Sequence, residues 1–333
     1  MVALAAGKEA FSDYSHKFSP KTFTQPQLFT CLVLKEFEKK DYRGVRQLLL
    51  DWPELCQVIG LKKVPHYTTL QKASRRLLQL PHVRKLLKGT VRRILKRRRN
   101  VPYGAGDSSG FDAHHASRYY IHRRDVNKSD ENRPKKRVAY RKYGKLMLIV
   151  CCRSHAILGM VASEGPTPDI DQLDGVLAEL APGVRVRHMV LDAGFDSAHN
   201  HRLLREDHGI LSTIPPEHGR PPKDPSTLPA DKYRRRMKTH FNLRAYRRRP
   251  QAETVFSMLK RNLGSALRGR TYHSRRRDMI LRSLTHNIAL ALLWVFYRAP
   301  YDPFSSFFSS FLFQPRDIVD RLIQAHCPAL SHL

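Results

Sequence analysis

Residues 186–200, VRHMVLDAGFDSAHN, contain a short apolar run that ends in Asp192 and is followed within four residues by a second acid, Asp196. An apolar run of this length, rich in valine, favours a buried strand. We expect a helix to begin near Ser197, and an aspartate just before a helix commonly caps it. Asp196 is therefore expected to be structural, which leaves Asp192 as the acid presented at the end of the strand.

Upstream, YGAGDSSGFDA places Asp107 near the end of another expected strand. The apolar runs KLMLIVCC and AILGMVAS add further short strands before Asp192, so the segment after residue 100 is predicted to form a sheet. Asp112 lies five residues beyond Asp107, and on a straight strand its side chain faces the opposite side of the sheet. We therefore prefer Asp107 as the partner of Asp192.

A third acid, Glu253, lies downstream in RAYRRRPQAETVFSMLKRN. Proline is tolerated in the first turn of a helix, so Pro250 predicts that Glu253 also lies in a first turn. Lys260 shares the face of Glu253, and Tyr246 and Arg249 approach the same site from just before the helix. The core side is expected to carry the apolar residues Val255, Phe256, Leu259 and Leu263. Residues 217–245, rich in Pro, Lys and Arg, are interpreted as a loop.

Three acids beside basic groups favour metal-dependent phosphoryl transfer. Two divalent ions about 3.5 to 4 Å apart can stabilise the attacking and leaving oxygens, and Mg²⁺ prefers oxygen ligands, with Mn²⁺ as a substitute. We assign Asp107 and Asp192 to a shared platform for two ions and Glu253 to the second ion, which positions the attacking water or 3′-hydroxyl. Guanidinium and ammonium groups stabilise phosphate charge. The alternative is that the basic groups form surface ion pairs on an exposed helix.

The composition indicates a polyanionic partner, because 60 Lys and Arg against 29 Asp and Glu give a formal net charge of +31. Nucleic acid is the usual partner of so basic a chain. The charge is concentrated in residues 84–99 and 232–249, each free of acids. Taken alone, each run could also be a solvated helix face or a disordered arm.

Residues 24–80 are predicted to form short helices. Thr24 is expected to cap the first of them, and capping-box spacing occurs at Asp51 with Glu54 and at Thr68 with Gln71. Two helices across a turn suggest a helix-turn-helix. In its second helix the inward stripe is Leu70, Ala73 and Leu77, and the exposed residues available for a DNA groove or for phosphates are Lys72, Arg75 and Arg76. The alternative is an ordinary helical bundle with a basic surface.

Several separated segments together resemble the bacterial insertion-sequence DDE transposases. These segments are FTQPQL, GLKKVPHYTTL, DSSGF, LDAGFDS, the Tyr/Arg/Glu/Lys block and LRSLTHNIAL, in the family's order across roughly residues 20–295. The block consists of Tyr246, Arg249, Glu253 and Lys260, whose spacing resembles the family signature. The resemblance implies an α/β, ribonuclease-H-like catalytic domain, a mixed sheet flanked by helices, preceded by a small all-helical DNA-binding domain. It also implies that the Tyr, Arg and Lys of the block grip phosphates at the transposon end.

On this basis we expect residues 1–99 to bind DNA, residues 100–300 to be catalytic, and residues 301–333 to form a tail of unknown role. The expected partners are double-stranded DNA, both terminal inverted repeats and target DNA, and a second copy in a homodimer assembled on DNA. No small-molecule cofactor is expected. The expected reaction cleaves the element ends and joins the 3′-hydroxyls to target DNA. Two alternatives remain: an inactive, transposase-derived regulator, against which the three acids argue, and a ribonuclease-H-like nuclease without strand transfer.

The expected location is the cytoplasm, with association with the bacterial nucleoid when DNA is bound. The N-terminal segment has too short an apolar stretch and too early an acid for a secretory signal. LTHNIALALLWVFY, residues 284–297, is too short to span a membrane and is predicted to be a buried core helix. The five cysteines lack paired metal spacing, which favours a reduced cytosolic protein. His114 and His115 are expected to contact DNA or to support a metal ligand.

Overall fold

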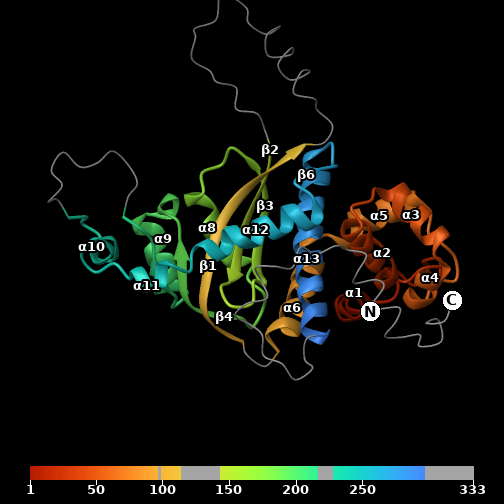
Figure 1. Cartoon of the computed structure of the whole chain (residues 1–333), viewed down its shortest axis with the longest axis horizontal. Helices are drawn as coiled ribbons and strands as arrows, with labels where there is room; N and C mark the ends of the chain where they lie inside the picture. Colours follow the sequence, from red (N-terminus) through yellow and green to blue (C-terminus); the bar gives the residue numbers. More distant parts are fainter. Residues whose placement is uncertain (97–98, 114–142, 217–227, 297–333) are drawn as a thin grey trace, which may run out of the picture.

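The computed structural model describes residues 1–96, 99–113, 143–216 and 228–296. The N-terminal helices pack together at one end of the molecule (Figure 1). They are α1 (Val2–Ala10), α2 (Gln25–Phe37), α3 (Tyr42–Asp51), α4 (Pro53–Ile59) and α5 (Tyr67–Leu77). The longer α6 (Leu80–Leu95) follows and packs on β3 and α13, so it joins this helical part to the sheet.

The centre of the molecule is a mixed sheet in the order β3-β2-β1-β4-β5. Its strands are β1 (Asn100–Ala113), β2 (Tyr143–Cys151), β3 (Ile157–Gly165), β4 (Arg185–Leu191) and β5 (Leu211–Thr213), with the short β6 (Ala266–Leu267) paired to the end of β1. The first three strands are antiparallel neighbours, whereas β4 and β5 run parallel to β1. This mixed sheet flanked by helices is ribonuclease-H-like, as the sequence predicted.

Glycines on β1 leave room for side chains of the neighbouring strand β4. A Cβ atom on Gly106 would lie 2.5 Å from Leu191 Cδ2, and one on Gly104 would lie 3.0 Å from Val186 Cγ1. The space that side chains on β1 would need is therefore filled by side chains from β4. This packing fixes the register, in which Gly106 pairs with Leu191.

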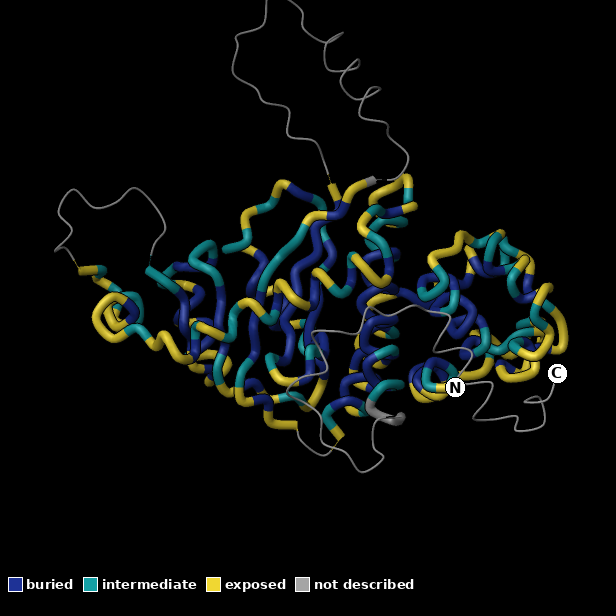
Figure 2. Tube along the Cα trace, viewed as in Figure 1, coloured by how far each residue is buried: buried dark blue, intermediate teal, exposed yellow. Residues whose placement is uncertain are grey.

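Helices cover the sheet, and their core-facing sides are buried (Figure 2). The helices after β3 are η1 (Ile170–Gln172), α8 (Leu173–Ala178), η2 (Ala193–Phe195), α9 (Ala198–Arg202), the π-helical η3 (Leu203–Asp207), α10 (Lys232–Thr239), α11 (Leu243–Tyr246), α12 (Pro250–Leu263) and α13 (Tyr272–Phe296), of which α10 packs on α9. α12 packs on β1 and β2, and α13 packs on β2, β3, α6 and α2. α13 thus connects the N-terminal helices to the sheet.

Two polar side chains attach α13 to the start of β3. The Asn287 side chain accepts from the Ile157 N–H at 2.9 Å and donates to the Ile157 carbonyl at 2.8 Å. His286 Nε2 lies 3.0 Å from the carbonyl oxygen of His155. Residues 284–288 are buried, as predicted for a core helix. In the part of the chain that the structure describes, no helix has the length and apolarity needed to cross a bilayer.

Helix boundaries were predicted with mixed success. Thr24 forms the expected capping box, with Gln27. The box at Asp51 is wrong, because Asp51 is the last residue of α3 and Pro53 begins α4 directly after Trp52. The box at Thr68 and Gln71 is also wrong, because α5 begins at Tyr67 with His66 as its N-cap. The predicted inward stripe of α5 is buried, and its basic residues are exposed: Lys72, Arg75 and Arg76.

The predicted loop at residues 217–245 is wrong over α10 and the start of α11, which are helical. Asp231 accepts hydrogen bonds from the backbone N–H groups of Tyr233 and Arg234 and so caps α10, and Asn242 caps α11 in the same way. Residues 217–227 lie outside the described residues, as do His114, His115 and the tail at 301–333.

Candidate metal and phosphate site

The strand register brings the first two acids side by side. Gly106 and Leu191 are paired in parallel strands, and the next residue on each chain is an acid, Asp107 and Asp192. One oxygen of each carboxylate accepts the N–H of the following residue, Ser108 or Ala193, at 2.8 Å. The parallel pairing of β1 and β4 therefore places two carboxylates at one level of the sheet.

The third acid reaches the same place from α12. Pro250 is the first residue of this helix and Glu253 lies in its first turn, as predicted. Arg249 joins the acids, because its guanidinium forms an ion pair with Glu253 and lies 3.1 Å from Oδ2 of Asp192. We call Asp107, Asp192, Glu253 and Arg249 the acid cluster.

The acid cluster carries more negative charge than its one arginine balances. The pKa of Asp107 is raised to about 6, mainly by burial; the Ser108 N–H and Arg249 lower it, and the Glu253 and Asp192 carboxylates raise it. Burial lowers the pKa of Arg249, but the carboxylates of Asp192, Asp107 and Glu253 outweigh it, so the net shift is upward. A further cation at this point would relieve the repulsion between the carboxylates.

The donor atoms of the acid cluster are of the kind that hard divalent cations bind. Carboxylate oxygens suit Mg²⁺ or Mn²⁺, and the side chains of Asp192 and Glu253 are 45% and 53% exposed. Within the described residues, no three acidic, histidine or cysteine side chains are already gathered around one point that could hold an ion. Arg249 bridges Asp192 and Glu253, so the type and charge of the ligands fit a metal, whereas their present arrangement is that of an ion-pair network.

Two further residues of the Tyr/Arg/Glu/Lys block lie next to the acid cluster. Lys260 Nζ donates to Ser109 Oγ at 2.7 Å and lies 5.3 Å from the centroid of the Phe111 ring. Ser109 and Phe111 share the face of β1 that carries Asp107, since alternate residues of a strand face the same side. Tyr246 is half-buried and contributes to the raised pKa of Arg249. The structure therefore brings the whole block together at Asp107.

Contacts not anticipated from the sequence fix the start of α12. Gln251 Oε1 lies 2.6 Å from His155 Nε2, and the Arg248 guanidinium lies 4.1 Å from the centroid of the Tyr103 ring. Tyr103 in turn stacks on His188 at 5.2 Å. Tyr103 lies on β1, His155 in the turn before β3 and His188 on β4. Their proximity depends on how the strands are paired, which the sequence does not indicate directly.

The remaining acids considered from the sequence lie elsewhere. Asp112 is exposed and pairs through its backbone with Ala266 of β6. Asp196 is not the N-cap of α9, because Ser197 accepts from the Asn200 N–H and performs that role. Asp196 instead lies buried against Arg234, with Nη2 to Oδ2 at 2.7 Å. Its expected structural role therefore has a different physical basis, a buried ion pair between the β4 loop and α10.

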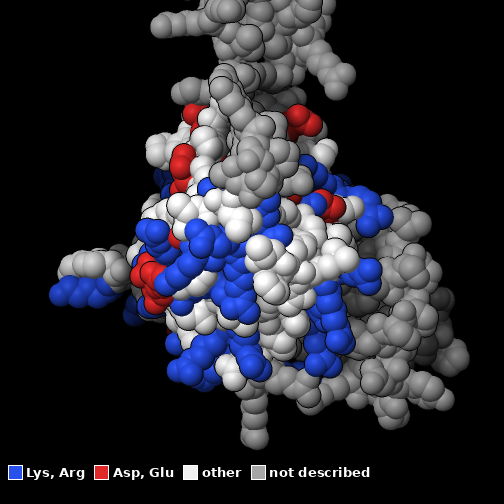
Figure 3. All heavy atoms as spheres, turned by 90° about the vertical axis from the view of Figure 1, so that its left-hand side faces the viewer, with Lys and Arg blue, Asp and Glu red and all other residues white. Residues whose placement is uncertain are grey.

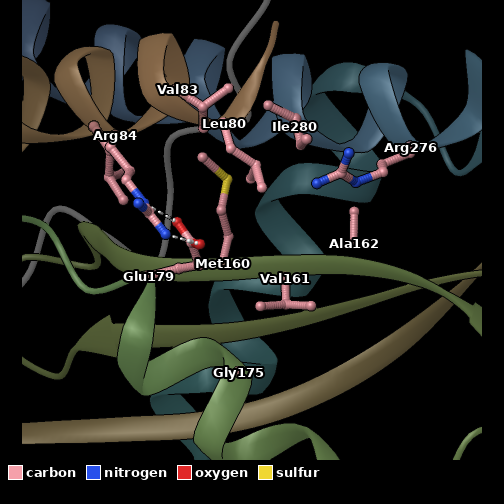
Figure 4. Close-up of a pocket in the computed structure, with 11 residues that line it drawn as sticks. Leu80, Val83, Arg84, Met160, Val161, Ala162, Gly175, Glu179, Arg276 and Ile280 are labelled. Carbon is pink, nitrogen blue, oxygen red and sulfur yellow. Dashed lines mark hydrogen bonds and ion pairs between the residues drawn. The ribbon is translucent and has the colours of Figure 1, made fainter. Parts of the chain in front are cut away.

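Two other features are separate from the acid cluster. α5, with Lys72, Arg75 and Arg76, lies at the opposite end of the molecule from α10 and α11 (Figure 1). A mostly apolar cavity of about 220 Å³ lies between α6, β3, α8 and α13, beside the ion pair of Arg84 with Glu179 at 2.6 Å (Figure 4). No residue of the acid cluster lines it.

The family match agrees with this arrangement. The family described as "Transposase DDE domain" matches residues 104–288, more than half of the chain and all of the acid cluster. The sheet carries one acid within β1, a second directly after the parallel neighbour β4 and a third on a following helix, which is a ribonuclease-H-like arrangement. The chain belongs to the DDE transposase family.

The solved structures that match this chain resemble it only weakly. The crystal structure of the Mos1 strand transfer complex is 13% identical over 85% of this chain and 79% of that chain, with a TM-score of 0.26. That of a pre-cleavage Mos1 transpososome is 12% identical over 87% and 83%, with a TM-score of 0.20. No curated protein matches this chain.

Proposed function

We propose that this DDE transposase is encoded by a bacterial insertion sequence, cleaves DNA at the ends of that element and joins the 3′-hydroxyls to target DNA. The observation that carries the proposal is the register of β1 and β4, which sets Asp107 beside Asp192, together with Arg249, which links Asp192 to Glu253. The Tyr/Arg/Glu/Lys spacing, assembled at one place in the fold, supports the insertion-sequence assignment.

In this proposal Asp107 and Asp192 hold a shared platform for two Mg²⁺ ions, which Mn²⁺ can replace, and Glu253 binds the second ion. Bound divalent ions would activate the attacking oxygen and stabilise the leaving oxygen. Arg249 keeps Asp192 and Glu253 close to each other and offers a guanidinium to phosphate. Lys260, fixed by Ser109 on the Asp107 face of β1, places a second positive group on the same phosphate-binding side.

We further propose that residues 1–99 form the DNA-binding part, residues 100–300 the catalytic part, and that the exposed basic side of α5 recognises the terminal inverted repeats. Lys72, Arg75 and Arg76 are all exposed on that side, and such a helix suits a DNA groove or its phosphates. A homodimer assembled on two DNA ends would provide one acid cluster for each end. The cytoplasm, with the nucleoid when DNA is bound, is the proposed location.

The decisive experiment is a strand-transfer assay on the DNA that flanks the coding region. That DNA is searched for inverted repeats, and a duplex carrying one end is incubated with the purified chain, Mg²⁺ and a supercoiled target plasmid. The proposal predicts cleavage at the repeat boundary and covalent joining to the plasmid. Cleavage without joining would indicate a nuclease, and specific binding without cleavage would indicate a regulator; either result contradicts the proposal.

A further inference from the structure

Helix α10 presents a basic surface that the acid cluster does not use. Tyr233, Arg234 and Met237 face inward, and Met237 is buried. The outer side carries the exposed basic residues Lys232, Arg235, Arg236 and Lys238. Viewed from the end of the molecule that α10 occupies, Lys and Arg side chains gather over the surface, with acids mainly at its margin (Figure 3). α10 is therefore a candidate for binding a polyanion.

A buried ion pair fixes α10 to the loop that carries Asp192. Arg234 donates to both oxygens of Asp196, through Nε at 3.0 and 3.1 Å and Nη2 at 2.7 Å. The Asp196 side chain is fully buried, whereas that of Arg234 is 30% exposed. Asp196 lies only four residues beyond Asp192. The position of α10 is thus tied to the position of the acid cluster.

The ion pairs of α10 and its neighbours leave positively charged side chains on the outer surface of the helix. Lys232 is paired with Glu206 at 2.9 Å, and Asp231 with Arg202 at 3.2 Å. Arg235 and Arg236 form no ion pair with any described residue. Burial and the nearby Arg236 both lower the pKa of Arg205, so like charges already crowd each other here. A phosphate backbone alongside α10 would reduce that repulsion.

The place of α10 in the fold indicates which DNA it meets. α5 lies at one end of the molecule and α10 at the other, with β1 and α12, which carry Asp107 and Glu253, between them (Figure 1). A duplex whose terminal repeat is bound at α5 and cut at the acid cluster continues toward α10 on the outer side of the cut. We infer that the outer side of α10 binds the phosphate backbone of the DNA flanking the element. This inference rests on the proposed function.

The test compares two duplexes that differ only in flanking DNA. One carries the terminal repeat and about 20 base pairs beyond the cleavage point; the other ends at that point. The full chain is compared with an Arg235→Gln, Arg236→Gln double variant, whose two changes are at exposed positions. The matched control is an Arg185→Gln, Arg187→Gln double variant, which removes the same charge from two exposed positions on β4 that have no part in the proposed DNA contacts.

We expect the wild type and the control to bind the flanked duplex more tightly than the duplex that lacks the flank. The α10 variant should lose this preference, with a slope of log binding constant against log salt lower by about 1.8 on the flanked duplex alone, since each phosphate contact contributes about 0.9. Between 50 and 200 mM salt this corresponds to about a tenfold smaller loss of affinity than in the wild type.

Two results would overturn the inference: an α10 variant that keeps the preference for the flanked duplex, or one that weakens both duplexes equally. The proposed function fails in a different way, when the wild-type chain neither distinguishes the repeat from random duplex nor cleaves it. Wild-type cleavage together with an unaltered flank preference in the α10 variant would reject the α10 surface alone.

Discussion

The acid cluster and a second, buried charge cluster contain similar charged groups, but they differ in burial and in the balance of acids and bases. The buried charge cluster consists of Lys35, Glu36, Asp278 and Arg282, where α2 meets α13, and each of these residues is at most 9% exposed. Its two acids face two bases from within the protein. In the acid cluster, three acids share one arginine, and two of the three acids are about half exposed.

The hydrogen bonds show what this difference means. Glu36 contacts both Lys35 and Arg282, and Asp278 accepts the Gly269 N–H at 2.8 Å. Arg282 also donates to the carbonyls of Gly264 and Ala266, each at 2.7 Å, at the end of α12. Charges satisfied in this way hold elements together. Acids in excess at an accessible place are suited to bind an external cation. Mutations in the acid cluster should therefore reduce activity and leave stability unchanged, whereas mutations in the buried charge cluster should reduce stability.

The largest effect is expected in the acid cluster. Asp107→Asn, Asp192→Asn and Glu253→Gln should each reduce Mg²⁺-dependent DNA cleavage by at least about 10²–10³-fold, because each removes an electrostatic ligand from the reacting phosphate's site. Binding to DNA ends and thermal stability should stay near the wild-type values. Near-normal cleavage by one of these variants at ordinary Mg²⁺ would remove that residue from the metal site.

The buried charge cluster should show the opposite behaviour. Glu36→Gln leaves the bases Lys35 and Arg282 short of a partner, and breaking a buried pair costs about 3–5 kcal/mol. Chemical denaturation measures this loss. Glu9→Gln is the control, because Glu9 pairs with Arg92 and Arg93 at the surface and a surface pair contributes about 1 kcal/mol or less. Equal losses in the two variants would show that the buried cluster does not stabilise the fold as argued.

Acid pH should destabilise the buried region in which α13 packs, because His286 lies on the same helix as Asp278 and Arg282 and is buried. Burial lowers the pKa of His286 to about 4, although its bond to the His155 carbonyl opposes this. The unfolded chain takes up a proton near pH 6.5 that the folded chain excludes, so stability is complete above that pH and falls between pH 6.5 and 4. The loss should reach roughly 3 kcal/mol by pH 4. His286→Gln should remove this part of the pH dependence in denaturation curves; an unchanged slope would contradict it.

The smallest effect concerns two basic groups, Arg249 in the acid cluster and Lys260 beside it. Arg249→Ala and Lys260→Ala should each flatten the salt dependence of DNA binding by about 0.9 in slope and lower cleavage, since the scissile phosphate is held less well in line. Added Mg²⁺ should rescue neither variant, because neither supplies a metal ligand. Arg261→Ala, an exposed neighbour on α12, is the control. If both variants showed wild-type DNA binding, salt dependence and cleavage, the Tyr/Arg/Glu/Lys spacing would have no functional meaning.

Local features of the fold were predictable from the sequence. Apolar runs located β2, β3 and β4, Pro250 placed Glu253 in a first turn, and the inward stripe of α5 was predicted from its period. Each of these depends on neighbours a few residues apart. Asp192 was found from its position after a strand and Glu253 from its position in a first helical turn, whereas Asp107, expected near a strand end, lies in the middle of the longer β1.

Features that depend on distant residues were not predictable. α10 lies within a Pro- and Arg-rich segment, and its attachment through Arg234 involves Asp196, which is 38 residues away. Arg249 was expected on phosphate, and its ion pair with Asp192 depends on how α12 lies on the sheet. The glycines of β1 left its register open, because only the packing of Leu191 and Val186 against them determines it.

The central claim is that the acid cluster binds divalent metal ions. Its most direct test is to measure Mn²⁺ binding by electron paramagnetic resonance in the presence of a DNA end. The account predicts that wild-type protein binds Mn²⁺ on the DNA complex, that an Asp107→Asn, Asp192→Asn double variant binds DNA but loses this Mn²⁺, and that Asp112→Asn retains it. Equal Mn²⁺ binding by the wild type and the double variant would show that the acid cluster is an ion-pair network and not a metal site.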